Sequence, residues 1–165
     1  MNIKRIARHL LTTDGQVSRS FGPGILTKIE AAIQVSEAEH AGEIRFVVEG
    51  GLDGALLFKG QSARERAIDL FSHLRLWDTQ QRTGVLIYLL LADRAVEIVA
   101  DRGINAQVDS QEWATVCRQM EAAFRQSNFE SGVVAGVQAV TRQLKAHFPL
   151  DIRDRNELPD KPVVL

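Results

Sequence analysis

The side chains that could do chemistry in this 165-residue chain are acids and arginines placed where apolar segments begin or end. Glu43 opens an alternating segment, Asp78 and Arg82 precede the most apolar run, and Asp101 and Arg102 follow a second run. Carboxylates that converge from separate segments are what a hard, oxygen-preferring cation such as Ca²⁺ or Mg²⁺ needs. An arginine beside such a cation could steady a phosphoryl group. Whether these side chains meet depends on the elements that carry them.

The most apolar run, Gly84 to Ala92, predicts the centre of a sheet. A short continuous apolar run bounded by turn residues fits a strand buried on both faces, and this one is too short for a membrane span of about 20 residues. The polar break Asp93-Arg94 and the β-rich run Ala95 to Ala100 follow directly. The two runs therefore predict a tight antiparallel hairpin.

A second predicted strand precedes this hairpin. The segment EIRFVVE, Glu43 to Glu49, alternates apolar and polar residues as a strand does. Between it and Gly84, Ser62 and Glu65 form a capping box that predicts a helix to about Trp77. Strand, helix and strand form a βαβ unit with parallel strands and a right-handed connection.

The remaining apolar spacing predicts helices on both sides of this sheet. Further helices are expected at about Pro23 to His40, Ser110 to Gln126 and Gly132 to His147. The predicted fold is α/β, a three-layer α/β/α sandwich with a small mixed sheet flanked by helices. Because three strands are few for this length, a further short strand is expected near 55–58.

The predicted topology gathers charged residues at two edges of the sheet. The start of the parallel strands and the end of the third strand share one edge, which predicts metal ligands at Glu43, Asp78 and Asp101 and ligand-binding roles for Arg82 and Arg102. The opposite edge lies at the carboxyl ends of the parallel strands, where open α/β sheets bind ligands. It collects Glu49, Asp53, Asp93 and Arg94; of these, Asp93 and Arg94 are the ligand-binding candidates.

The competing interpretation gives these residues structural roles. Asp93 suits a hairpin turn, Asp78 suits a loop after a helix, and the arginines could pair with the acids. Cys117 lies inside a helical pattern without a histidine partner and is expected to be a buried, inert thiol. His9, at a predicted helix end, is expected to be incidental. No residue is assigned a catalytic role.

Composition limits the class of protein. Hydrophobic residues make up 45% and charged residues 25%, as in a soluble globular protein, and the length predicts a single domain over 1–165. A net charge of −1 gives no electrostatic reason to expect nucleic acid binding, whose usual footprint is a basic face. No CxxC or HExxH spacing for zinc occurs. Ca²⁺ or Mg²⁺ is therefore the expected cofactor if the edge acids bind metal, and otherwise none is expected.

The two ends of the chain predict different structures. Residues 2–13 predict an amphipathic helix, basic on one side and with Ile3, Ile6, Ala7, Leu10 and Leu11 on the other. The helix would pack on the domain or lie on an anionic membrane surface. Residues 149–165 are charged, carry two prolines after Pro149 and lack periodicity, so an extended arm that is ordered only if it docks is expected.

These segments together resemble the TPM-domain family. The resemblance covers about Leu26 to His147 and rests on GEIRFVV (42–48), on Leu70-Phe71 through Trp77, on TGVLIYLL (83–90), on Asp93-Arg94 through Asp101-Arg102-Gly103-Ile104, and on Phe124 with FESG (129–132). Family members usually carry a signal peptide and a C-terminal membrane helix or low-complexity tail. Since this sequence shows neither, it looks like the short soluble bacterial subgroup, cytoplasmic or peripheral at the inner membrane.

The resemblance implies an α/β/α fold, calcium binding reported in some members, and weak acid-phosphatase activity claimed for a plant member. Two functions compete. The first, which we favour, is a non-catalytic accessory domain that works with a membrane protein or membrane surface. The alternative is a metal-dependent phosphatase-like hydrolase with weak activity, which lacks an obvious nucleophile, a P-loop or a paired-aspartate motif.

Overall fold

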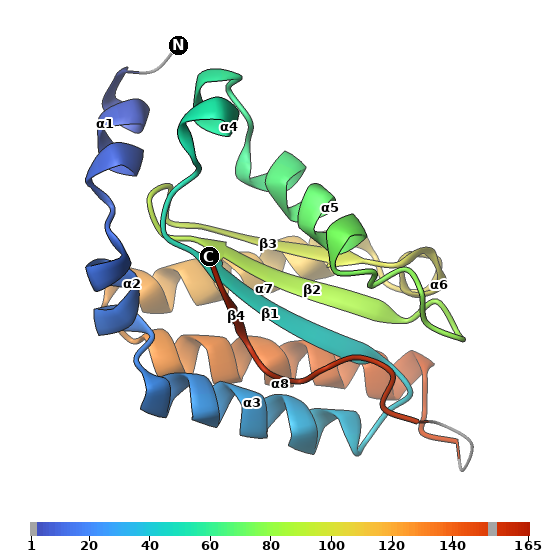
Figure 1. The fold of residues 1–165 in the computed structure, drawn as a ribbon. Helices are drawn as coiled ribbons and strands as arrows, with labels where there is room; N and C mark the ends of the chain where they lie inside the picture. The colour runs from blue at the N-terminus through green and yellow to red at the C-terminus, as the bar shows by residue number, and fades with distance from the viewer. Residues whose placement is uncertain (1–2, 152–154) are drawn as a thin grey trace.

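A mixed sheet of four strands lies at the centre of the computed structural model, which describes residues 3–151 and 155–165. The strands are β1 (Glu43–Glu49), β2 (Gly84–Leu90), β3 (Ala95–Ala100) and β4 (Val163–Val164), in the order β3-β2-β1-β4. The helices are α1 (Ile3–Leu11), α2 (Asp14–Ser20), α3 (Pro23–Glu37), α4 (Gly54–Phe58), α5 (Ala63–His73), α6 (Arg102–Asn105), α7 (Ser110–Arg125) and α8 (Phe129–His147). Figure 1 shows helices on both faces of the sheet, so the predicted three-layer α/β/α fold is confirmed.

The strand pairing also matches the prediction. β1 and β2 are parallel, with Glu43 opposite Gly84, and β2 and β3 are antiparallel, with Val85 opposite Ala100. All seven residues of β2 are buried, as its continuous apolar run requires. The starts of β1 and β2 and the end of β3 therefore share one edge, here called the amino edge. The ends of β1 and β2 and the start of β3 form the other, the carboxyl edge.

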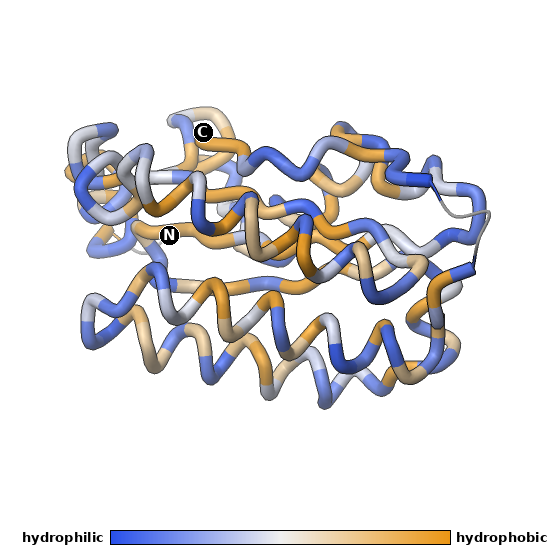
Figure 2. The backbone as a smooth tube through the Cα atoms, turned by 90° about the horizontal axis from the view of Figure 1, so that it is seen from below, coloured by the Kyte–Doolittle hydropathy of each residue, from blue (hydrophilic) through white to orange (hydrophobic). Residues whose placement is uncertain are grey.

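Each face of the sheet has its own hydrophobic core. One core joins Ile44, Phe46 and Ile87 to α3, α7 and α8, and the other joins Val47 and Leu86 to α5. Alternate residues of the strands supply the two cores, because successive strand side chains point to opposite faces. Figure 2 shows the matching alternation of hydrophobic and hydrophilic residues along the helices.

The fourth strand is not the one expected from the sequence. Residues 55–58 belong to the helix α4, because the carboxylate of Asp53 caps its first turn by accepting from the Leu56 N–H at 3.0 Å. The fourth strand is β4, near the end of the chain, which pairs in parallel with Val47 and Val48 of β1. The predicted C-terminal arm thus docks on the sheet. Residues 2 and 152–154, which belong to the predicted N-terminal helix and arm, lie outside the described residues.

The segment between α1 and Phe21 is helical, although no helix is predicted there. It forms α2, whose first residue is Asp14, and buries Val17. Within the described ranges, none of the helices is both long enough and apolar enough to cross a bilayer.

Along the outer edge of β3, no strand formed by the described residues pairs with the backbone groups. Side chains from outside the sheet occupy three of these groups. Glu121 accepts from the Val96 N–H at 3.0 Å, Arg64 donates to the Ile98 carbonyl at 2.5 Å, and Asn105 donates to the Ala100 carbonyl at 2.7 Å.

Candidate functional site

At the amino edge, Glu43 is held by the C-terminal tail. Its side chain lies in a residue only 5% exposed, and its carboxylate accepts the backbone N–H groups of Glu157 at 3.0 Å and Leu158 at 3.1 Å. Burial raises the pKa of Glu43, while these two hydrogen bonds act in the opposite direction. The carboxylate therefore fixes the tail on β1.

The other acids predicted at this edge do not join Glu43. Asp101 caps α6, with Oδ1 accepting the Arg102 N–H at 2.7 Å, and its buried Oδ2 has no hydrogen-bond partner among the described residues. Asp78, Arg82 and Arg102 are exposed. In the described part of the chain, no three His, Cys, Asp or Glu side chains form a group that could hold a metal ion. The predicted ligands Glu43, Asp78 and Asp101 thus share an edge without converging, and metal binding by any one of them stays a prediction.

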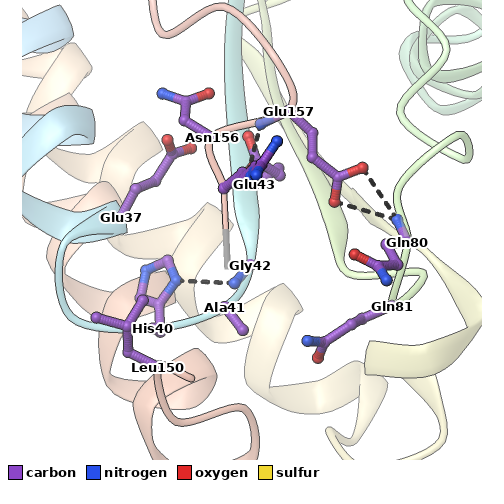
Figure 3. A pocket seen from close by; sticks show the side chains of 11 residues that line it. Glu37, His40, Ala41, Gly42, Glu43, Gln80, Gln81, Leu150, Asn156 and Glu157 are labelled. Atoms are coloured by element: carbon purple, nitrogen blue, oxygen red, sulfur yellow. Dashed lines mark hydrogen bonds between the residues drawn. The ribbon is translucent and has the colours of Figure 1, made fainter. Parts of the chain in front are cut away.

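A cavity of about 310 Å³ lies at the same edge, between the end of α3, the start of β1 and the tail. Figure 3 shows Glu37, His40, Glu43 and Glu157 around it. Burial raises the pKa of Glu37 to about 9, against the effect of the Ile44 N–H that donates to it at 2.7 Å. Burial likewise lowers the pKa of His40 to about 4. Both side chains are therefore neutral at pH 7, and the cavity holds less charge than its composition indicates.

At the carboxyl edge, Asp93 lies in the β2–β3 turn and binds the N-terminal helix. Its carboxylate accepts from Arg5 Nε at 2.9 Å and Nη2 at 2.8 Å, from His9 Nε2 at 3.0 Å, and from Arg8 Nη2 at 3.3 Å. The side chain of Asp93 is 14% exposed. Burial by itself would raise the pKa of Asp93, but the hydrogen bonds from Arg5 and His9 outweigh it and lower the pKa.

His9 connects this carboxylate to the loop after β1. Its side chain is fully buried, and Nδ1 accepts the Leu52 N–H at 2.9 Å. Because Nδ1 is an acceptor, Nε2 carries the proton and donates to Asp93. The helix backbone approaches this loop so closely that a Cβ on Gly51 would lie 2.9 Å from the His9 carbonyl oxygen. The prediction that His9 is incidental was wrong.

The contacts of His9 and Arg5 set which side of α1 faces the domain. Ile6 is partly buried against the core of α5, but Ile3, Leu10 and Leu11 are 76%, 65% and 71% exposed. Most of the predicted apolar side therefore points away from the domain, and the helix contacts the domain mainly through its basic side. The reason is that three residues of the basic side, Arg5, Arg8 and His9, bind the carboxylate of Asp93, which the sequence spacing alone does not reveal.

The remaining acids of the carboxyl edge have structural partners. Glu49 is buried and accepts from Arg66 at 2.9 and 3.0 Å and from the Tyr88 hydroxyl at 2.7 Å. Asp53 caps α4. Arg94, in contrast, is exposed in the β2–β3 turn with φ 53°, and its guanidinium has no hydrogen-bond or ion-pair partner among the residues that the structure describes.

Sequence reasoning missed Arg5, His9 and Glu37. One signal for the first two was present: Arg5 and His9 are four residues apart and so lie on the same side of a helix. No comparable signal marks Glu37, because its burial depends on how the tail covers the amino edge.

Comparisons with known proteins agree with the fold. The structure is similar to the NMR structure of the BA42 protein from the psychrophilic bacterium Bizionia argentinensis, with a TM-score of 0.76 and 30% identity, over 86% of this chain and 93% of that one. The N-terminal domain of a protein from P. gingivalis shares the fold, with a TM-score of 0.55, 19% identity and 76% of each chain covered. No curated protein matches the sequence. The family model of the TPM domain matches residues 21–143, and the chain therefore belongs to the TPM domain family.

Proposed function

We propose that this TPM domain is a non-catalytic accessory domain that binds a membrane surface peripherally through the outward side of α1. The observation that carries the proposal is the exposure of Ile3, Leu10 and Leu11 on one helix. Monomeric soluble proteins rarely gather large apolar side chains on one exposed face without an interaction partner. These three residues are here called the apolar face of α1.

The composition of α1 and its surroundings supports a lipid surface as the partner. Lys4 and Arg8 are exposed on the same helix, and an interfacial helix characteristically combines leucine or isoleucine with basic residues. Phe58, 61% exposed, lies on α4, which contacts α1. Transfer of three such aliphatic side chains from water releases roughly 5 kcal/mol before the cost of binding. Figure 1 shows α1 at the periphery of the molecule, where it could meet a flat surface.

The arrangement of the residues gives the phosphatase alternative less support. The acids of the amino edge lie apart, and Glu43 and Glu49 are occupied by backbone or side-chain donors. Burial raises the pKa of the Cys117 thiol to about 12, so this cysteine is a poor nucleophile at neutral pH. These features favour binding over hydrolysis.

Co-sedimentation with vesicles tests the proposal. Full-length protein is mixed with vesicles of phosphatidylcholine alone or with phosphatidylglycerol, and compared with the variant Leu10→Glu/Leu11→Glu. The matched control is Val35→Glu, which places the same charge on a residue of α3 that is 66% exposed. We expect the wild type and Val35→Glu to sediment with anionic vesicles, and the α1 variant to lose most of this binding. Equal binding by all three proteins, or no binding by the wild type, would refute membrane docking through α1.

A further inference from the structure

A cavity of about 500 Å³ lies beside the apolar face of α1, between α1, α2, the β2–β3 turn and the turn before α8. Its most notable feature is its charge: three arginines, Arg8, Arg19 and Arg94, line it, and no acidic residue does. Leu11 and Phe129 supply apolar wall. Three segments, α1, α2 and the β2–β3 turn, thus each bring one arginine to the same concave place. We call it the arginine cavity.

Much of the charge of these arginines is uncompensated. Arg8 has Asp93 at 3.3 Å, but that carboxylate also accepts from Arg5 at 2.8 Å and from His9. Arg19 uses Nε to donate to the Gly15 carbonyl at 3.1 Å, which leaves other N–H groups of its guanidinium for a ligand.

Of the three arginines that line the cavity, Arg94 is the one whose guanidinium has no partner among the described residues. The carboxylate that shares a neighbouring cavity of about 220 Å³ with it, Glu121, accepts from the Val96 N–H at 3.0 Å. Arg94 is the last residue of the β2–β3 turn, where its backbone has a positive φ of 53°, and it lines the arginine cavity. The cavity therefore presents several guanidinium N–H donors and a net positive charge.

We propose that the arginine cavity binds the phosphate group of an anionic lipid. Guanidinium groups match the oxygen geometry of phosphate and bind it with charge-assisted, frequently bidentate hydrogen bonds. Leu11 lines the cavity and belongs to the apolar face of α1, so a phosphate at the membrane surface would meet the arginines as Leu11 enters the bilayer. The inference rests on the proposed function, because it assigns the lipid class that the same surface selects. A phosphate monoester, with up to two negative charges, should bind more tightly than a diester.

The test measures binding of full-length Arg94→Gln and Arg19→Gln to phosphatidylcholine vesicles containing phosphatidic acid or phosphatidylglycerol at equal charge. Arg75→Gln is the matched control for Arg94→Gln, because Arg75 is also exposed and also has a positive φ, 56°. We expect each cavity variant to bind phosphatidic acid vesicles about fivefold more weakly, the effect of one arginine near an anionic surface. Arg75→Gln should bind like the wild type. If it loses as much as Arg94→Gln, general surface charge explains the binding and the cavity inference is overturned.

Two further comparisons distinguish a lipid phosphate from a soluble one, and the cavity inference from the proposal of membrane docking. Glycerol 3-phosphate and inorganic phosphate are titrated while the amide NMR signals of Arg8, Arg19 and Arg94 are followed. Saturable millimolar or tighter shifts, with no preference for phosphatidic acid vesicles, would replace the lipid by a soluble phosphate. If Leu10→Glu/Leu11→Glu loses vesicle binding while Arg94→Gln keeps it, membrane docking stands and the cavity inference fails. If Arg94→Gln loses vesicle binding while Leu10→Glu/Leu11→Glu keeps it, the docking proposal fails and the cavity inference stands.

Discussion

His40 should make the stability of the domain fall steeply below pH 6.5. The residue is 1% exposed, and its hydrogen bonds fix one neutral tautomer. Thr141 donates to the Val137 carbonyl at 2.7 Å and so accepts from the Ser36 hydroxyl at 2.6 Å. Ser36 in turn accepts from His40 Nε2 at 2.8 Å, while Nδ1 accepts the Gly42 N–H at 3.1 Å. A second proton on Nδ1 would break the bond to Gly42 and leave a buried charge.

The magnitude follows from the pKa of His40. Burial lowers it to about 4 in the folded protein, against 6.5 when the side chain is exposed. Between these values the unfolded chain binds more protons, so the stability contributed by neutral His40 is present above pH 6.5 and is lost as pH falls toward 4. Proton linkage for this pair of values gives a loss of about 2 kcal/mol between pH 7 and pH 5.

Urea unfolding at pH 7 and pH 5 measures this loss in the wild type and in His40→Gln. We expect the wild type to lose about 2 kcal/mol more than the variant between the two pH values. Comparison with the variant removes the contributions of other titrating groups. If both proteins show the same pH dependence, the reasoning is refuted. Should His40→Gln fail to fold, the ring signals of His40 in the wild type give the answer, since a titration midpoint near 6.5 would contradict a buried neutral imidazole.

Three further predictions follow from close contacts and buried charge. Asp93→Ala should release α1 from the carboxyl edge at a cost of about 1–3 kcal/mol, because Arg5 and His9 lose their acceptor. Amide hydrogen exchange over residues 3–11 should become faster, and unchanged protection would argue against this anchor. Gly84→Ala should destabilise the domain by several kcal/mol, on the order of the strongest overpacking effects, because a Cβ would lie 2.1 Å from the Leu76 carbonyl oxygen. A melting temperature equal to that of the wild type would disprove this clash. Glu37→Gln should stabilise the domain more at pH 8 than at pH 5, by up to about 4 kcal/mol, because the raised pKa means that stability falls as pH rises from 4.5 toward 9. Chemical denaturation at both pH values measures the difference, and an equal effect of the substitution at both would contradict a neutral Glu37.

Local pattern was sufficient for most of the fold. The capping box of Ser62 and Glu65 marks the start of α5, and the Asp93-Arg94 break marks the hairpin turn. Local pattern failed where a segment depends on distant partners. The two residues of β4 are too few to show alternation, and they form a strand because β1 offers an unpaired edge. No helix is predicted between residue 13 and Pro23, yet Asp14 begins α2, where an acid suits the positive end of the helix dipole.

The site was harder to predict than the fold for the same reason. The topology correctly grouped Glu43, Asp78 and Asp101 at one edge, but sharing an edge does not bring side chains together. The orientation of α1 depends on Asp93, which is 84 residues from His9 in sequence. A helix with one apolar and one basic side can dock by either, and the contacts of the basic side with a half-buried carboxylate decide the outcome here.

The side chains that occupy the outer edge of β3 have a consequence for how copies of the domain behave when crowded. An open strand edge is a template on which a second copy can add a strand, and such addition leads to fibres. Here a second copy would first have to displace Glu121, Arg64 and Asn105 from the backbone groups that they occupy. The opposite edge ends in the two-residue β4, which is too short to guide stable pairing. If the domain concentrates on a bilayer as proposed, it can therefore reach high local density without its sheets joining edge to edge.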